Sequence, residues 1–373
     1  MNRLVLIGNG FDLAHGLRTS YKDFIFWYYK EWGKRLLTSS TKLESDKLCS
    51  FTLKDEIDLA AWHLVWGYRY QRKNPLEPWN PSDVFFKALE DKEMCDFKFD
   101  SPLLKRIWNQ ILLGWVDIEN EYYSLLKTEK MTMDNRIVQP DFKKLNEHLD
   151  ILRNNLIQYL KLETENKPTT VINDIADRIY RPIKAREISV AYTGTVGDIH
   201  TEEKEPSAIM MLNFNYTSTP EQYVSDPSKV TINYIHGKLE NPESVIFGYG
   251  DELDFGFNKL KNMNDNEALR NIKSIRYLES DNYRKMLEFI ESAPFQLCIM
   301  GHSCGNSDRT LLNTLFEHRN CVSIRPYYYV NEEKDNYMDL AMNISRNFTD
   351  MKLMRDRVVN KEYCEPLVER AKE

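Results

Sequence analysis

Apolar residues along this chain recur with two different periods. Between about residues 21 and 180 they return every three or four positions, as in "YKDFIFWYYKEW" and "FKKLNEHLDILRNNLIQYLKLE", which predicts amphipathic helices. Elsewhere, short runs rich in β-branched and aromatic residues each end in a polar or glycine turn, which is typical of strands. These runs are "RLVLI", "SAIMMLNFNYT", "KVTINYIHG", "SVIFGYG", "FQLCIMGHS" and "VSIRPYYYV".

The later strand candidates alternate with helical segments. "NEALRNIKSIRYLESDNYRKMLEFIESAP" has a helical pattern, and "SDRTLLNTLFEHRN" begins another helix, capped by Ser307 or Asp308. Apolar strands that alternate with helices favour a mostly parallel sheet covered on both faces. We therefore predict an α/β fold with one sheet domain at residues 1–20 and 206–355, a large helical insertion at 21–205, and a C-terminal helix or tail at 356–373.

Composition narrows the class of protein. The 373 residues are 42% apolar and 29% charged, as expected for a soluble globular chain. A net charge of -7 gives no general attraction to nucleic acid or anionic membranes, although it leaves open a local basic groove. No apolar run approaches the roughly 20 residues of a membrane span, and no signal peptide is visible. We expect a cytoplasmic protein.

The six cysteines are scattered and form no C-x-x-C pair. This spacing supports neither a zinc knuckle nor a disulfide framework, so reduced thiols and no bound metal are expected. Cys304 is a conceivable nucleophile, but no neighbouring feature of the sequence marks its thiol as activated.

Five strand candidates end in residue types that are typical of ligand-binding and catalytic sites. In an open α/β sheet, ligands bind outside the carboxyl ends of the strands. The ends here are "GNGFD", "NFNYT", "IHG", "GYGDE" and "GHSCGNSD". Several independent strands ending in Gly, Asn, His or Asp are harder to attribute to turn formation than one alone.

The first of these ends predicts a nucleotide-binding turn. Gly8 and Gly10 allow close approach of a phosphate, and the following helix would add free N–H groups. Leu13 replaces the third glycine of the G-x-G-x-x-G fingerprint, so a simple tight turn is the alternative. The cofactor-binding candidates in this segment are Gly8, Asn9, Gly10, Phe11 and Asp12.

The next two ends place amides and a histidine together. Asn213 and Asn215 lie on one face of an extended segment and suit a ribose or amide ligand, or an Asx turn. His236 follows a strand and precedes Gly237, so it can exchange a proton near neutral pH or serve as a structural histidine. Tyr216 and Phe214, with Phe11, are candidates for pocket walls.

The segment "MGHSCGNSDRTL" supplies the last candidates. Gly301, His302, Ser303 and Asp308 are predicted to close over part of a nucleotide. Ser303 lacks the G-x-S-x-G elbow of a nucleophilic serine.

Together, "LVLIGNGFDLAHGLRTSYKDF", "WVDIE", "NFNYT", "IHG", "FGYGDE" and "MGHSCGNSDRTL" resemble the bacterial abortive-infection AbiH family of phage-defence proteins, from residue 4 to about residue 315. The same motif order is similar to a diverged sirtuin-like domain. Gly8-Asn9-Gly10, Asn213-Phe214-Asn215 and His236-Gly237 stand where sirtuins have their Gly-rich loop, Gln-Asn-Ile-Asp and His-Gly segments.

The resemblance implies a Rossmann-like, sirtuin-like sheet that binds NAD, with His236 as general base and Asn215 orienting a ribose hydroxyl or a water. Defence-associated sirtuin-like domains often cleave NAD to nicotinamide and ADP-ribose. This chain lacks the paired zinc cysteines of sirtuins, and Asn9 and Phe11 replace the alanine and serine of their loop. Protein deacylation is therefore a poorer fit than NAD hydrolysis.

Three functions remain open. The first is an NAD-hydrolysing defence enzyme, held inactive until a phage-derived trigger appears and capable of forming a homo-oligomer. The second is a sensor or scaffold module that binds NAD or a related nucleotide without hydrolysing it. The third is a metal-dependent nuclease using Asp12, Asp251 and Asp308, although their spacing matches no two-metal pattern.

Overall fold

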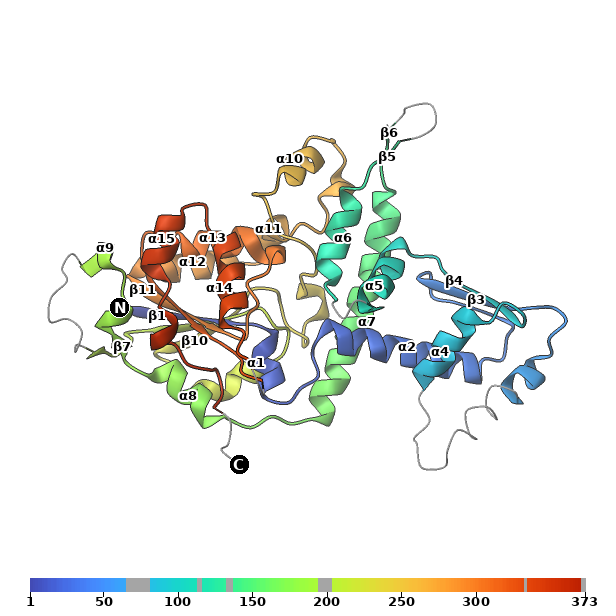
Figure 1. The fold of residues 1–373 in the computed structure, drawn as a ribbon, viewed down its shortest axis with the longest axis horizontal. Coiled ribbons are helices and arrows are strands. Elements are labelled where there is room, and N and C mark those ends of the chain that lie inside the picture. Colours follow the sequence, from blue (N-terminus) through green and yellow to red (C-terminus); the bar gives the residue numbers. More distant parts are fainter. Residues whose placement is uncertain (65–80, 113–115, 132–136, 194–202, 332–333, 370–373) are drawn as a thin grey trace. The chain divides into compact units, whose positions relative to one another are not determined.

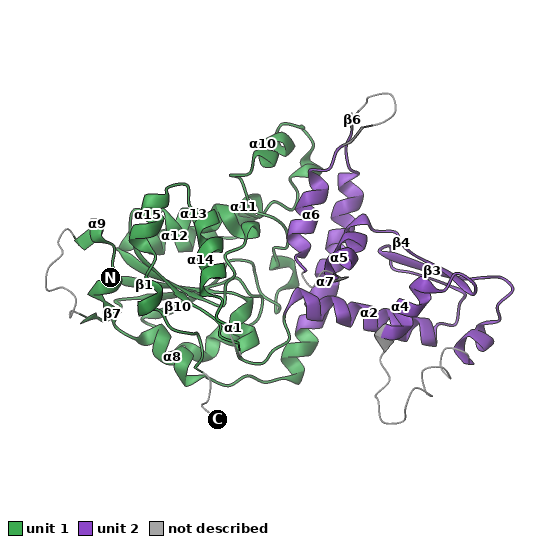
Figure 2. Ribbon diagram, viewed as in Figure 1, with its two compact units in different colours: residues 1–19, 161–373 green, residues 20–160 purple. Residues whose placement is uncertain are grey.

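The computed structural model of the chain describes residues 1–64, 81–112, 116–131, 137–193, 203–331 and 334–369. Two compact units are present (Figure 2). The first, which we call the sheet unit, contains residues 1–19 and 161–373, and the second, the insertion unit, contains residues 20–160. The sequence placed the end of the insertion at residue 205, whereas residues 161–205 cluster with the sheet unit.

A five-stranded parallel sheet forms the centre of the sheet unit (Figure 1). The strand order is β10-β9-β1-β11-β12, and every neighbouring pair is parallel. Numbered along the chain, this order is 3-2-1-4-5, which matches the first five positions of the 3-2-1-4-5-6 order found in many doubly wound α/β sheets. The prediction of an α/β fold with a mostly parallel sheet is confirmed. The strands are β1 (Asn2–Ile7), β9 (Ile209–Asn213), β10 (Val230–Tyr234), β11 (Phe295–Met300) and β12 (Cys321–Tyr327).

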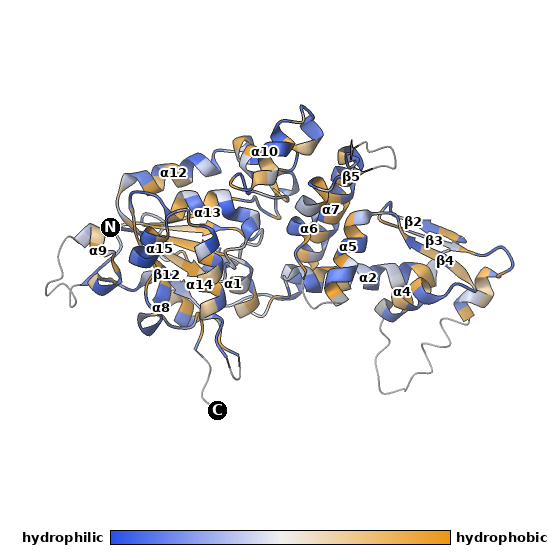
Figure 3. Ribbon diagram, turned by 45° about the horizontal axis from the view of Figure 1, so that its top comes forward, coloured by the Kyte–Doolittle hydropathy of each residue, from blue (hydrophilic) through white to orange (hydrophobic). Residues whose placement is uncertain are grey.

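Apolar side chains cover both faces of this sheet. Leu4 and Leu6 pack on one side with the helices at residues 282–292, 309–316 and 337–346, while Val5 and Ile7 pack on the other with the helix at residues 173–180. Burial on both faces explains why the strands are continuous apolar runs rather than alternating ones. In Figure 3 the strands of this sheet are coloured mostly as apolar. The helices of the unit are α1 (Asn9–Ala14), α8 (Asn173–Tyr180), α9 (Val190–Thr193), α10 (Phe255–Lys261), α11 (Lys273–Arg276), α12 (Asn282–Ser292), α13 (Arg309–Phe316), α14 (Tyr337–Arg346) and α15 (Met351–Arg357).

The strand predicted at "SVIFGYG" is wrong. Residues 245–248 form a buried loop, and Tyr249 makes only an isolated bridge to Ile272. A Cβ at Gly248 would lie 2.0 Å from the carbonyl oxygen of Asn271, so the loop needs glycine for this close approach. The apolar run reflects burial, and a buried loop can have the same apolar sequence as a buried strand.

The insertion unit combines helices with an antiparallel sheet that the sequence did not predict. Its strands β2 (Leu43–Ser45), β3 (Cys49–Leu53) and β4 (Cys95–Phe99) pair in the order β2-β3-β4. Alternate residues of β3 and β4 are buried, and the centre of the Phe97 ring lies 5.0 Å from that of Phe85 in the helix at residues 81–90. The helices are α2 (Tyr21–Thr38), α4 (Pro81–Glu90), α5 (Pro102–Leu112), α6 (Ile118–Leu126) and α7 (Phe142–Asn166), the last of which continues into the sheet unit.

Four short strands form two small ribbons. One ribbon pairs β5 (Lys130–Met131) with β6 (Ile137–Val138), and the other pairs β7 (Ile183–Lys184) with β8 (Glu203–Lys204). In the described part of the chain, no helix is both long and apolar enough to cross a membrane.

The segment after α15 runs beside β12 instead of extending the helix. The N–H of Val359 donates to the carbonyl of Ile324 at 2.9 Å, and that of Leu367 donates to Tyr328 at 2.8 Å. The expected C-terminal tail is thus bound along the edge strand of the sheet over its described residues, which protects backbone groups that an exposed edge would leave unpaired.

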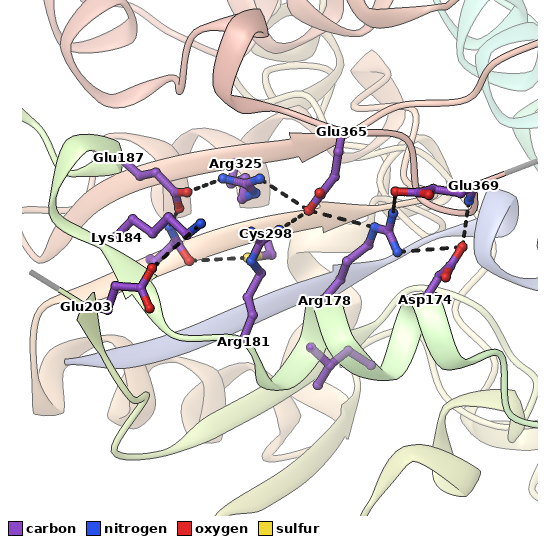
Figure 4. Close-up of polar contacts among 12 residues, drawn as sticks. Asp174, Arg178, Arg181, Lys184, Glu187, Glu203, Cys298, Arg325, Glu365 and Glu369 are labelled. Carbon is purple, nitrogen blue, oxygen red and sulfur yellow. Dashed lines mark hydrogen bonds and ion pairs between the residues drawn. The ribbon is translucent and has the colours of Figure 1, made fainter. Parts of the chain in front are cut away.

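Ionic contacts hold this segment in place (Figure 4). Glu365 pairs with Arg181 and lies 3.4 Å from Arg325, and Arg325 also pairs with Glu187. Gln296 of β11 extends the set by donating to Glu187 at 2.9 Å. We call Arg325, Glu187, Arg181 and Glu365 the Arg325 network.

Candidate functional site

The predicted site residues come from four adjacent strands and meet at one edge of the sheet. Asn215, just after β9, donates from Nδ2 to the carbonyl of Gly8, just after β1, at 3.0 Å. The neighbouring Phe214 ring lies 5.2 Å from the ring of His236 and 4.2 Å from that of His302. The carboxyl ends of β1, β9, β10 and β11 therefore bring together residues that are almost 300 positions apart in sequence.

The glycines after β1 serve close packing against the loop after β11. A Cβ at Gly8 would lie 2.5 Å from Cα of His302, and one at Gly10 would lie 2.8 Å from Cα of Gly301. Gly301 has φ +76° and faces the backbone N of Phe11. Glycine is therefore required at these positions because two backbone segments lie in close contact there. This contact is at the point where the strand order reverses.

The other residues of this turn have partners within the unit. Asn9 Oδ1 accepts a hydrogen bond from Thr19 Oγ1 at 2.6 Å. The buried Phe11 ring packs 4.8 Å from His15 and 5.5 Å from Tyr223. These contacts place both side chains in the local packing of α1.

Asp12 is a buried carboxyl group at the start of α1, with a side chain 1% exposed. Thr217 Oγ1 donates to its Oδ2 at 2.7 Å. Burial raises the pKa of Asp12 to about 6, even though the side chains of Thr217, Thr219 and Asn215 lower it. Among the described residues, Oδ1 of Asp12 has no hydrogen-bond partner.

The side-chain amides of Asn213 and Asn215 form hydrogen bonds that stabilise the turn after β9. Asn213 donates from Nδ2 to the carbonyl of Thr217 at 3.0 Å, and its Oδ1 accepts from the N–H of Asn215. This is the Asx-turn alternative considered for the segment, combined with the contact from Asn215 to Gly8. Tyr216 donates to the carbonyl of Ile246 at 3.1 Å.

A second group of polar side chains surrounds Asp308. Its Oδ1 lies 2.8 Å from Lys273 Nζ and 3.3 Å from His236 Nε2, and its Oδ2 lies 3.7 Å from His302 Nε2. All four side chains are buried, Lys273 being 1% exposed. We call Asp308, Lys273, His236 and His302 the Asp308 cluster. His236 Nε2 also lies 3.1 Å from the hydroxyl of Tyr277.

The charges in the Asp308 cluster fix its protonation. Burial alone would raise the pKa of Asp308, but the Lys273 ammonium and the His236 ring outweigh burial and hold it well below its usual range. Burial lowers the pKa of His236, and Lys273 lowers it further. These shifts favour the carboxylate form of Asp308 and the neutral form of the His236 ring at neutral pH.

Backbone contacts orient the remaining residues of these loops. His302 Nδ1 accepts from the N–H of Cys304 at 3.0 Å, and His302 Nε2 lies 3.7 Å from Oδ2 of Asp308. Gly237 has φ +85°, and a Cβ there would lie 2.1 Å from the carbonyl oxygen of Ser244. Ser303 is exposed, and its carbonyl accepts from Asn343 at 2.9 Å.

Over residues 4–329 the chain matches the model of the family described as "Bacteriophage abortive infection AbiH". The chain belongs to the AbiH family. The match includes every strand end described above. No curated protein and no solved structure matches the chain.

Some residues of this AbiH-family site were not predicted from sequence. Lys273 and Tyr277 lie in a segment interpreted only as helical, and Thr217 lies in a turn. A lysine in an amphipathic pattern is usually exposed, so no local signal distinguishes Lys273 from its neighbours. Trp115 of the "WVDIE" motif lies outside the described residues, and Asp117 caps α6 by accepting from the N–H of Asn120.

The three aspartates considered as metal ligands have different partners. Asp12 accepts from Thr217, Asp308 contacts Lys273, and Asp251 lies 3.3 Å from Arg309. Within the described parts of the chain, no group of three or more His, Cys, Asp or Glu side chains is arranged to hold a metal ion. The thiol of Cys304 is buried, and burial raises its pKa well above the ordinary value, which favours the unreactive thiol form.

Proposed function

We propose that this AbiH-family chain acts in anti-phage abortive infection by hydrolysing NAD to nicotinamide and ADP-ribose. One observation supports the proposal above the others. The carboxyl ends of four parallel strands, in the 3-2-1-4-5 order, bring Asn215, His236 and the turn at Gly8 together. Sheets with this order bind nucleotides at this edge, next to the point where the order reverses.

The reaction sets clear requirements. The bond between C1′ of the ribose and the nicotinamide nitrogen breaks, and nicotinamide leaves with the electron pair. Water then forms the new C–O bond at C1′ and gives up one proton. The transition state resembles an oxocarbenium ion, so the enzyme needs fixed acceptors near the ribose and a proton acceptor for the water or a ribose hydroxyl.

In this proposal His236 is the general base and Asn215 orients the ribose hydroxyl or the water. A neutral His236 ring has one nitrogen able to accept a proton. Asp308 lies 3.3 Å from Nε2 and would stabilise the imidazolium that forms. Phe214, with its ring against His236, would exclude water from the departing nicotinamide.

Nicotinamide release from NAD tests the proposal. Purified wild-type chain, alone and with extract from phage-infected cells, is compared with His236→Ala and with His318→Ala. His318 pairs with the exposed Glu291, so it serves as a matched control. We expect release by the wild type and His318→Ala, and a loss of about 100-fold or more in His236→Ala. Absence of release from the wild type under both conditions contradicts the proposal.

A non-hydrolytic nucleotide sensor is the second candidate. The observation in its favour is that the polar side chains at this edge already bond to one another or to the backbone, as Asn213 and Asn215 do. A sensor predicts that NAD raises the melting temperature of the wild type and of His236→Ala equally, with no nicotinamide formed.

A further inference from the structure

Three backbone N–H groups of the turn after β1 already have acceptors within the protein. The N–H of Gly8 donates to Met300, that of Gly10 donates to Gly301 at 2.8 Å, and that of Phe11 donates to Gly8 at 2.9 Å. Phosphate-binding turns offer such N–H groups to the ligand. The space beside both glycines is filled by the backbone at Gly301 and His302.

The same turn carries a buried hydrogen-bond acceptor instead. Thr217 Oγ1 donates to Oδ2 of Asp12, and Thr219 Oγ1 in turn donates to Thr217 Oγ1 at 3.3 Å. This chain of hydroxyls fixes the orientation of the carboxyl group. Oδ1 is left without a hydrogen-bond partner among the described residues, although leaving a buried carboxylate oxygen unsatisfied is costly.

The neighbours of Asp12 indicate which part of a ligand it would meet. Thr217, whose hydroxyl donates to Oδ2, lies two residues after Asn215, and Asn215 donates to the carbonyl of Gly8 at 3.0 Å. Asn215 is the residue proposed to orient the ribose at the bond that breaks. A carboxylate attracts a hydroxyl donor and repels a phosphate.

We propose that the turn after β1 recognises a sugar hydroxyl, not a phosphate, and that Asp12 Oδ1 accepts a hydrogen bond from the 2′-hydroxyl of the nicotinamide ribose. This inference rests on the proposed function and assigns the substrate group that Asp12 selects. The glycines of "GNGFD" then serve to place the carboxylate, and the phosphates bind elsewhere at the sheet edge.

Binding calorimetry with a pair of NAD analogues tests the inference without relying on turnover. The ligands are NAD, NAD lacking the 2′-hydroxyl of the nicotinamide ribose, and NAD lacking the 2′-hydroxyl of the adenosine ribose. The proteins are the wild type and Asp12→Asn, both checked for folding by thermal denaturation. Thr217 donates to Oδ2, so the amide oxygen of Asp12→Asn would take the place of Oδ2 and the NH₂ group that of Oδ1. The variant therefore loses one hydrogen-bond acceptor, while the volume of the side chain stays nearly the same.

We expect Asp12→Asn to bind NAD about tenfold or more weakly, since a charge-assisted hydrogen bond is lost. The wild type should also bind the nicotinamide-side deoxy analogue about tenfold more weakly, and the variant should not discriminate against it. The adenosine-side analogue should behave as NAD does in both proteins.

Three results overturn the inference, and they are distinguishable. Tighter NAD binding by Asp12→Asn means that the carboxylate repels a phosphate at this turn. Equal binding of NAD by both proteins means that Asp12 makes no contact, while the proposed function survives. Absence of NAD binding by the wild type contradicts the proposed function together with the inference.

Discussion

The sheet unit contains two buried sets of charges that differ in chemistry. The Asp308 cluster combines a carboxylate with a lysine and two histidines, and lies at the carboxyl ends of the strands. The Arg325 network joins arginines to glutamates and binds the C-terminal segment beside β12. Both place charged groups in the protein interior, but only the first contains histidines, whose ordinary pKa lies near neutral pH.

This difference distinguishes the candidate site from a structural contact. Guanidinium groups stay charged at every physiological pH and bind carboxylates through several N–H groups, which suits a fixed crosslink. Histidines and a buried lysine change protonation when their surroundings change, which suits chemistry. A buried ionic cluster therefore indicates a functional site only when its members can titrate.

The largest expected effect tests the structural role of the Arg325 network. Glu187→Ala leaves the Arg325 guanidinium, 2% exposed, without its closest carboxylate. Breaking a buried pair in this way costs about 3–5 kcal/mol. Urea denaturation measures the free energy of unfolding, and Glu187→Leu with Arg325→Met is the control that should recover most of the loss. A loss below about 1 kcal/mol, the range of an exposed ion pair, would show that the network is not structural.

The second prediction concerns a gain in stability at the candidate site. Asp12 has a pKa of about 6 in the folded chain and about 3.9 when unfolded, so its ionisation opposes folding at pH 7. Asp12→Asn should raise the free energy of unfolding by about 1–3 kcal/mol at pH 7. Below about pH 3.9, where both states are protonated, the gain should vanish. Denaturation at both pH values checks this sign, and a destabilised variant at pH 7 contradicts it.

A third prediction uses the pH dependence of the Asp308 cluster. Burial depresses the pKa of His236, so the unfolded chain binds a proton more readily than the folded one. Stability contributed by neutral His236 is therefore present above about pH 6.5 and is lost as pH falls below it, by about 1.4 kcal/mol for each pH unit down to the folded pKa. His236→Gln should lose less stability than the wild type between pH 7.5 and pH 5.

When the wild type is compared with His236→Gln, the contributions of all other titrating groups to the pH dependence of stability cancel. Burial also lowers the pKa values of His15 and His148, and both residues are unchanged in the variant. Melting curves recorded at several pH values give the two slopes. Identical slopes would mean that folding leaves the pKa of His236 unchanged, which contradicts the prediction.

The smallest effect concerns the exposed end of the Arg325 network. The Glu365 side chain is 30% exposed, so water and salt weaken its pairing with Arg181. Glu365→Gln should lower the free energy of unfolding by about 0–1 kcal/mol, and roughly 1 M salt should reduce the difference. A loss as large as that of Glu187→Ala would mean that the two carboxylates are equally desolvated.

Particular residues show why the sequence predicted some features and not others. Residues 2–7, 209–213 and 295–300 are strands because both faces of a central parallel strand are buried, and this leaves a continuous apolar run. "SVIFGYG" has the same signal without a strand, since a buried loop also needs apolar residues. The short strands β3 and β4 were missed because their pairing joins segments more than 40 residues apart.

The sequence by itself determined the α/β class, the family resemblance and the residue types at the strand ends, because burial and turn formation act locally. Tertiary structure alone decided what those residues contact. It placed Lys273 beside Asp308, used the glycines of "GNGFD" to pack two backbone segments, and left one oxygen of Asp12 without a partner among the described residues. Such contacts depend on distances between segments far apart in the chain, and no local pattern of residues encodes those distances.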